Sequence, residues 1–268
     1  MTWGQMRPRV MKMANPILGT LMGVCFLLAL LLFCLIGRVG TNKTLYHSQQ
    51  VVLDVAANVG LNQEQLDHVT GVLIDYLRGK NDDMQVVVEV DGTTQYVYTE
   101  RELAHMVDVQ QLFSWATNLQ AWATIAGALL GFAIWLLNGE EWFGVFCKGF
   151  IQGAVVGLGF VMLVIFIAAF DFDAAFTQFH HIFFDNDLWM MYETDFLIRI
   201  MPLEFFMAMA VRVAVWFLGL LAVAAAVVWS VWQRWKIGGF RFTVRAKNVP
   251  QTQKKAVPKK SSGKRRKR

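Results

Sequence analysis

The chain has 268 residues, of which 56% are hydrophobic and 17% charged, and its formal net charge is +5. Its mean hydropathy of +0.41 lies outside the usual range of water-soluble domains and inside that of polytopic membrane proteins. This composition excludes an ordinary soluble globular domain, so the bilayer is expected to be the main solvent of the fold.

Four apolar stretches are long enough to cross a bilayer, because a helical span needs roughly 20 residues that rise ~1.5 Å each. The four transmembrane helices are expected at 14–37, 115–137, 149–170 and 206–232. The expected extracytoplasmic parts are a cap at 38–114 and an interfacial loop with His180 at 171–205. The expected cytoplasmic parts are the N-terminus at 1–13, a loop at 138–148 and a basic disordered tail at 233–268. The second span is the shortest. The first is interpreted as an uncleaved anchor, because it lacks a small-x-small cleavage site before Arg38.

The basic residues indicate the orientation, because short cytoplasmic segments retain Lys and Arg. Three basic residues precede the first span, and 14 of the 25 lie between Arg234 and Arg268. Segment 38–114 carries 11 acids, and segment 171–205 carries seven acids against one base, Arg199. Both termini are therefore expected inside and both of these segments outside. The basic tail predicts adhesion to anionic membrane lipids, and no nucleic-acid partner is expected.

Turn and capping signals predict secondary structure in the cap. Asn62 can cap a helix that runs to about Arg78, and a hairpin is expected around the Asp91-Gly92 pair. Thr99 and Glu102 have the spacing of a capping box, which predicts a helix running toward the second span. The expected fold class is a polytopic α-helical membrane protein, with a four-helix transmembrane bundle under a small extracytoplasmic α+β cap.

Glycines recur at four-residue spacing within three of the predicted spans. Such small residues let membrane helices approach closely. They predict helix contacts within one chain rather than a dimer interface, and we expect a monomer; these glycines are Gly19, Gly23, Gly127, Gly131, Gly149, Gly153 and Gly157.

All five histidines fall in segments assigned to the outside. His47 and His68 have polar neighbours, which favours solvated surface imidazoles. His105 shares one side of its predicted helix with polar residues, and Asp108, one turn further on, could accept a hydrogen bond from its ring and fix its tautomer. The alternative is an exposed helix with an ordinary pair at this spacing.

His180 and His181 lie in a segment rich in phenylalanine and acidic residues, a composition that suits the lipid headgroup level. If the segment is helical, the two rings leave the axis about 100° apart, so one would be solvated and the other inward. The alternative is an interfacial anchor loop without chemistry.

Neither a metal site nor a protein nucleophile is well supported. The chain has no His-Glu-x-x-His motif and no cysteine pair, so no metal is expected. The outer segments contain only Ser48 and Ser114 as serines, and no cysteine. A base acting on an attacking group that arrives with the substrate is therefore favoured.

Two blocks of sequence stand out. The first block is the run from Glu102 to Val109 with the Tyr76-Leu77 pair before it. The second is the run from Phe179 to Phe184, followed by Asp187-Leu188-Trp189, Asp195, Leu197-Ile198 and Pro202. In this order and placement they resemble the lipoprotein intramolecular transacylases of Gram-positive bacteria. The similarity spans roughly residues 14–235 and departs from the family pattern after Trp189, where Tyr192-Glu193 replaces a common Asp-Pro turn.

The resemblance implies transfer of the sn-2 acyl chain of an S-diacylglyceryl group to the α-amine of the same N-terminal cysteine, which gives an N-acylated lyso-lipoprotein. It implies catalytic roles for His105 and His180, with Asp108 as orienter, and no cofactor. His180 would remove a proton from the amine while His105 donates to the oxyanion or the leaving oxygen, although the roles could be exchanged. Supporting or substrate-binding residues would be His181, Tyr76, Asp187, Trp189, Asp195 and Arg212.

The implied location is the bacterial cytoplasmic membrane, with the active site on the extracytoplasmic side. The implied partners are diacylglyceryl-modified lipoproteins and membrane lipids. Arg212, near the outer start of the fourth span, could instead snorkel or pair with Glu204. The main alternative function is a non-catalytic membrane scaffold or binding subunit for exported proteins, which would keep His105 and His180 apart. A transporter is disfavoured, because the spans show no internal repeats.

Overall fold

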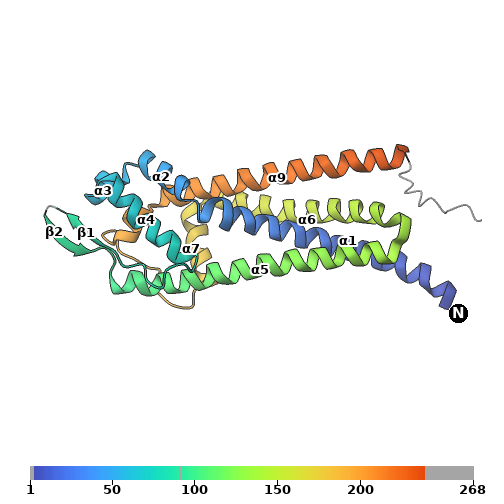
Figure 1. The fold of residues 1–268 in the computed structure, drawn as a ribbon, viewed down its shortest axis with the longest axis horizontal. Helices are drawn as coiled ribbons and strands as arrows, with labels where there is room; N and C mark the ends of the chain where they lie inside the picture. Colours follow the sequence, from blue (N-terminus) through green and yellow to red (C-terminus); the bar gives the residue numbers. More distant parts are fainter. Residues whose placement is uncertain (1–2, 91, 239–268) are drawn as a thin grey trace, which may run out of the picture.

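Four long helices lie side by side in an elongated bundle, and the remaining elements gather at one end of it (Figure 1). The computed structural model describes residues 3–90 and 92–238, so most of the predicted tail lies outside the described residues. The bundle consists of α1 (Trp3–Leu32), α5 (Glu100–Asn138), α6 (Trp142–Phe170) and α9 (Leu203–Gly238). Helix α1 packs against both α5 and α6, and α6 also contacts α9.

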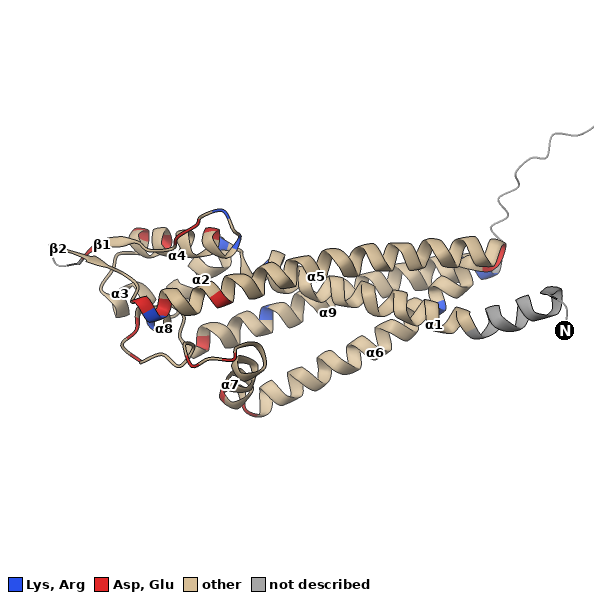
Figure 2. Cartoon of the chain, turned by 90° about the horizontal axis from the view of Figure 1, so that it is seen from below, with Lys and Arg blue, Asp and Glu red and all other residues tan. Residues whose placement is uncertain are grey.

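Three helical stretches of the described chain are long and apolar enough to cross a membrane: Ala14–Gly40, Glu100–Phe170 and Leu203–Lys236. The second stretch has 71 residues because it comprises α5, the short turn η2 (Gly139–Glu141) and α6. Large apolar side chains on these helices are exposed, among them Trp122 and Phe166, each 68% exposed. Charged side chains are sparse along the middle of the bundle and frequent at the cap end (Figure 2). This is the surface of a protein whose bundle is solvated by lipid.

The predicted glycine contacts are present between α1 and α6. A Cβ atom placed on Gly19 would lie 2.9 Å from the Cα atom of Gly149, and one placed on Gly23 would lie 2.9 Å from the Cα atom of Gly153. Real Cβ atoms essentially never approach another atom this closely. A side chain at any of these four positions would therefore push the two backbones apart. The contacts confirm the prediction of helix packing within one chain.

The cap is mixed α and β. From α1 the chain continues into the π-helix η1 (Phe33–Gly40), then α2 (Lys43–Val52), α3 (Val55–Val59) and α4 (Gln63–Leu77). The antiparallel strands β1 (Val87–Val90) and β2 (Thr93–Tyr96) form a hairpin in which Val87 pairs with Tyr96. The small sheet agrees with the expected α+β character of the cap.

Both predicted capping signals are confirmed. The Asn62 side chain accepts a hydrogen bond from the backbone of Gln65, and the Gln65 side chain accepts one from the backbone of Asn62, at the start of α4. Thr99 and Glu102 form the same reciprocal pair at the start of α5. Helix α5 then runs without a break for 39 residues, so it carries both His105 and the stretch predicted as the second span.

The cap has a buried core of its own. Leu66, Val69, Leu73 and Ile74 on α4 are fully buried and belong to one cluster with residues of the 171–205 segment and the start of α9. The side-chain amide of Gln50, also fully buried, donates to the backbone carbonyl of Ile200. The cap and the 171–205 segment are therefore packed together as one body.

Segment 171–205, predicted as an interfacial loop, contains two helices: α7 (Phe172–Phe183) and α8 (Phe196–Ile200). Asp171 caps α7 by accepting a hydrogen bond from the backbone of Ala174 at 3.0 Å. Helix α7 follows α6 directly and lies where the bundle meets the cap (Figures 1 and 2). This helix carries His180 to the join between the two regions.

Candidate active site

His105 on α5 and His180 on α7 lie next to each other. Their ring centroids are 6.1 Å apart and their planes are inclined by 33°. Both side chains are buried. The fold therefore brings together two histidines that are separated by 75 positions in the sequence.

His180 is held by one hydrogen bond and by aromatic rings on several sides. Its Nδ1 atom lies 2.8 Å from the backbone carbonyl oxygen of Phe176, one turn earlier on α7. Because a carbonyl only accepts, Nδ1 carries the proton and the neutral ring has its lone pair on Nε2. Trp189 stacks on the ring at 5.0 Å between centroids, and Phe176 and Phe179 meet it edge-on.

His105 is packed against Phe184, whose ring centroid lies 5.3 Å away. Phe184 also lies 5.6 Å from the ring of His180, so it fills one side of the gap between the imidazoles. The Nδ1 atom of His105 is buried without a hydrogen-bond partner.

Burial keeps both imidazoles neutral. His105 lies on the polar first part of α5, ahead of the apolar stretch 115–137, and burial together with the nearby His180 lowers its pKa from 6.5 to about 4, against a raising influence of Asp108. Burial also lowers the pKa of His180, partly offset by its hydrogen bond to Phe176, with His181 adding to the lowering. Each neutral imidazole carries one lone pair and one N–H without net charge, and the N–H of His180 is already engaged by the Phe176 carbonyl.

His181 is exposed, while its neighbour His180 is buried. The two rings leave α7 in different directions, and His181 meets the edge of Trp189 at 5.0 Å between centroids. The prediction that one imidazole is solvated and the other inward is confirmed.

The prediction that Asp108 accepts a hydrogen bond from the ring of His105 is wrong. The carboxylate of Asp108 instead accepts from the side-chain amide of Asn186 at 2.8 Å. The helical spacing of three residues brings Asp108 near His105, but the loop after α7 supplies a donor on the other side of the carboxylate. Asp108 thus connects α5 to the loop that carries Trp189.

A second connection holds the same loop. The guanidinium of Arg101 donates to the backbone carbonyl of Asp187 at 2.6 Å and lies over the ring of Tyr192. The side chain of Asp187 itself is exposed. Of the predicted supporting residues in this loop, Trp189 contacts the histidines directly. Asp187 takes part through its backbone carbonyl, which accepts the hydrogen bond from Arg101.

Three other predicted residues lie away from the histidines. Tyr76 is part of the cap core, and its backbone carbonyl accepts from Gln110. Asp195 accepts from the backbone of Tyr192 at 2.8 Å and lines a separate cavity of the cap. Arg212 on α9 is half-buried, and the described chain contains no ion pair between it and Glu204.

A cavity of about 330 Å³ opens beside the pair of histidines. Phe184, which touches both imidazoles, forms part of its wall. The other lining residues combine amides and carboxylates with apolar rings; they are Asp108, Gln111, Leu112, Trp115, Phe183, Asp185 and Asn186. Neither imidazole is among these lining residues, so the cavity adjoins the two histidines through Phe184.

Sequence reasoning missed the residues that link segments distant in sequence. Asn186 and Arg101 hold the loop after α7, and neither spacing nor composition marks them. Glu102 was recognised only as part of a capping box, yet its fully buried carboxylate also accepts from the backbone of Leu197 at 2.6 Å. No group of three or more metal-ligating side chains occurs among the residues that the structure describes.

A family model described as lipoprotein intramolecular transacylase Lit matches residues 20–206, more than half of the chain. The chain belongs to this family. Its members are acyltransferases that act on lipoproteins, so the chain is assigned to that class of enzyme.

Solved structures of the Lit enzyme from Bacillus cereus share the fold. One, described as membrane integral, has 18% identity and a TM-score of 0.64, covering 86% of this chain and 95% of that one. A variant with a histidine-to-arginine substitution has 16% identity and a TM-score of 0.70, covering 87% and 99%. A third, with a histidine-to-alanine substitution, has 17% identity and a TM-score of 0.64. No curated protein matches the chain. With its apolar helices, the chain is a Lit-family membrane protein.

Proposed function

We propose that this enzyme moves the sn-2 acyl chain of an S-diacylglyceryl cysteine to the α-amine of that same cysteine. The amine nitrogen attacks the ester carbonyl carbon, so a C–N bond forms and the bond between that carbonyl carbon and the glyceryl oxygen breaks. One amine proton leaves through the protein, and one proton arrives on the glyceryl oxygen. Atoms and charge balance without a cofactor. No ATP is needed, because an ester is exchanged for a more stable amide.

His180 is proposed as the base. Its Nδ1 proton is engaged by the Phe176 carbonyl, which leaves Nε2 free to accept a proton. Stacking against Trp189 fixes the ring plane, so the lone pair has one direction. The lowered pKa keeps the ring unprotonated and ready before substrate binds.

His105 is proposed as the donor to the oxyanion and the leaving oxygen. With a pKa of about 4, its ring acts as a neutral N–H donor whose hydrogen bond strengthens as negative charge develops. With their ring centroids 6.1 Å apart, the two imidazoles are close enough to act on the nitrogen and the oxygen of one substrate. The opposite assignment of roles would require His180 to give up its bond to Phe176.

The aromatic walls are proposed to hold the substrate folded on itself. Nitrogen must reach the carbonyl through a ring that passes along the cysteine Cα, Cβ and Sγ atoms and two glyceryl carbons. Enclosure by Phe184 and Trp189 would favour that folded shape and exclude water, which would otherwise hydrolyse the ester. Asp108, through Asn186, and Arg101, through the Asp187 carbonyl, are proposed as positioning residues of this wall.

The other predicted residues keep lesser roles. His181 and Asp187 are proposed to form the rim that meets the lipid headgroups, and Tyr76 to support α5 from the cap core. Asp195 is proposed to shape the outer cap, and Arg212 to lie at the outer membrane surface, where a lipoprotein carbonyl or lipid phosphate could reach it.

The proposed topology has four spans, formed by α1, α5, α6 and α9, in the cytoplasmic membrane, with the domain boundaries given above. Support comes from η2, which divides the second apolar stretch into two helices of 39 and 29 residues, each long enough to cross. The clustered Lys and Arg near both ends of the chain support cytoplasmic termini and an extracytoplasmic cap. We propose that the enzyme acts as a monomer on lipoproteins within the lipid bilayer.

The convergence of the two buried imidazoles carries this proposal. The test is expression of the chain in a bacterial host that makes only diacyl lipoproteins, followed by mass spectrometry of the N-terminal lipopeptides. An N-acylated monoacylglyceryl cysteine should appear with the wild-type chain and be absent with His180→Ala. Unchanged diacylglyceryl peptides with the wild-type chain present in the membrane would overturn the proposal.

A further inference from the structure

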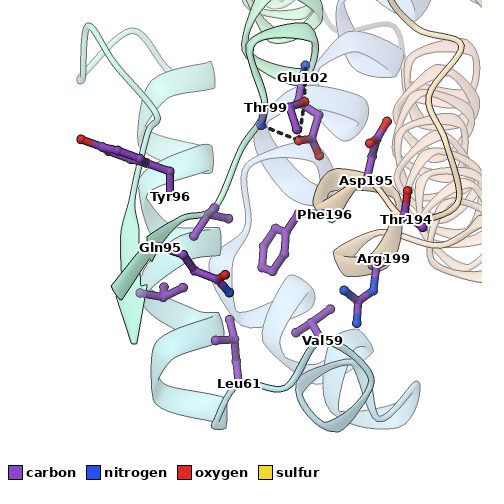
Figure 3. A pocket seen from close by; sticks show the side chains of 12 residues that line it. Val59, Leu61, Gln95, Tyr96, Thr99, Glu102, Thr194, Asp195, Phe196 and Arg199 are labelled. Carbon is purple, nitrogen blue, oxygen red and sulfur yellow. Dashed lines mark hydrogen bonds between the residues drawn. The ribbon is translucent and has the colours of Figure 1, made fainter. Parts of the chain in front are cut away.

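The cap contains a second cavity, of about 210 Å³, that is separate from the one beside the histidines. Strand β2, the linker before α4 and helix α8 surround it (Figure 3). The side chain of Gln95 points into this space and that of Tyr96 points away from it, while Phe196 lies between the walls (Figure 3). The three charged side chains at its edge are already engaged. Arg199 donates to the backbone carbonyl of Asn58, Glu102 accepts from the backbones of Thr99 and Leu197, and Asp195 accepts from the backbone of Tyr192. The cavity therefore suits an uncharged ligand.

Strand β2 presents a free edge next to this cavity. The backbone N–H of Val97 donates to the carbonyl of Val86, which makes these opposite residues a hydrogen-bonded pair. Bonded and non-bonded pairs alternate in an antiparallel ladder, so Thr94 and Tyr96, opposite Glu89 and Val87, direct their backbone N–H and C=O groups outward. In the described sheet, of order β1-β2, no strand pairs with that edge, and all four residues of β2 are exposed. Such an edge is a template for an added strand.

The cavity and the candidate active site both border α5. Glu102 lines the cavity and precedes His105 by three residues, a rise of about 4.5 Å along the helix. An extended peptide covers that rise with about two residues, at up to ~3.5 Å each. The residues that follow a cysteine held at the histidines would therefore come within reach of this cavity and of β2, which lines it.

We propose that the cavity and the free edge of β2 bind the polypeptide segment that follows the lipidated cysteine, as an extended strand added to the hairpin. This inference rests on the proposed function, because it takes a lipoprotein as the ligand. Recognition through backbone hydrogen bonds would be tolerant of sequence, as an enzyme acting on many exported lipoproteins needs. Gln95 would contact the peptide with its neutral side-chain amide, and Phe196 would form the floor beneath it.

The test compares two substrates with the purified full chain. One is S-diacylglyceryl cysteine amide, without a peptide; the other carries a tail of about five residues, enough for a strand. Wild type should have a KM roughly tenfold lower for the tailed substrate, as two or so net backbone hydrogen bonds would give. Gln95→Trp, which fills the cavity, and Thr94→Pro, which removes an outward N–H, should abolish that difference while leaving turnover of the cysteine amide unchanged.

Thr94→Trp is the matched control, because successive side chains on a strand point to opposite faces and this one leaves both the cavity and the outward N–H in place. It should retain the wild-type preference for the tailed substrate. Equal KM values for the two substrates with the wild-type chain would overturn the subsite and leave the proposed function standing. Equal losses on both substrates with Gln95→Trp would also overturn it. If the wild-type chain converts neither substrate, the proposed function itself fails.

Discussion

The bundle and the cap of this protein are built for different solvents. The bundle exposes rings such as Trp122 and Phe166 and is held together where glycine backbones of α1 and α6 touch. The cap instead buries aliphatic side chains of α4 in a core of the kind found in soluble domains. The pair of histidines lies where these regions meet, so each ring comes from an element anchored in both: α5 begins in the cap and α7 follows α6. The two histidines are thus held in place by the buried core of the cap on one side and by the helix bundle on the other.

The largest expected effect is on chemistry at the join. His180→Ala and His105→Ala should each lower single-turnover transacylation by roughly a hundredfold to ten-thousandfold, the usual contribution of general acid-base catalysis. His181→Ala is the control, since its ring is exposed and lies outside the pair; its rate should stay within a few-fold of wild type. Lipopeptide mass spectrometry at timed intervals measures all three. A His181→Ala loss as large as that of His180→Ala would contradict the assignment.

The second-largest effect is expected on the stability of the helix bundle, from a substitution that lies outside the cap. Gly153→Leu places a side chain against the backbone of Gly23, so it should destabilise the packing of α1 and α6 by about 1–3 kcal/mol or more. Gly159→Leu, on the same helix, has no atom within 4 Å of its Cβ position and should be nearly neutral. Thermal unfolding in detergent compares the two. Equal melting temperatures would show that the glycine contact does not hold the helices together.

The third prediction concerns the stability of the contact between the start of α5 and helix α8. Glu102→Gln replaces a buried acceptor-only carboxylate with an amide that brings its own N–H groups toward the Thr99 and Leu197 donors. The expected loss of stability is about 1–3 kcal/mol. Glu100→Gln, at an exposed position in the same helical turn, should change stability by less than about 0.5 kcal/mol. Chemical denaturation of both variants decides the point; indistinguishable midpoints would refute a structural role for Glu102.

The smallest effect concerns the wall of the site. Asn186→Ala removes one hydrogen bond to Asp108, worth about 0.5–1.5 kcal/mol, so we expect a rate only a few-fold below wild type. Glu193→Ala is the control, because this exposed residue of the same segment lines neither cavity. Steady-state turnover distinguishes them. An Asn186→Ala rate equal to that of Glu193→Ala would remove Asn186 and Asp108 from the positioning network.

Local signals in the sequence predicted what local physics determines. The cap at Asn62 and the capping box at Thr99 start helices at the expected residues, and the four-residue spacing of the glycines indicated close helix packing, without identifying which helices touch. The inward turn of one imidazole and outward turn of the other followed from helical geometry once α7 was taken as a helix. These features depend on residues within one or two turns of each other.

Contacts between distant segments could not be predicted in the same way. The pairing of Asp108 with Asn186 crosses 78 positions, and it displaced the nearer interaction with His105 that helical spacing suggested. The pairing of the two histidine-bearing elements was implied by the family resemblance alone. The second cavity of the cap left no mark in the sequence, because its lining comes from strand, loop and helix together.

The central claim is that buried imidazoles are held neutral at the boundary of the two regions. ¹⁵N NMR of histidine-labelled protein, with the His180 signal assigned by its loss in His180→Ala, follows protonation of that ring directly. Since burial lowers the pKa of His180 below its ordinary 6.5, the ring should remain mostly neutral at pH 6.5 and become half protonated only at a lower pH. Half protonation at or above pH 6.5 would contradict the account.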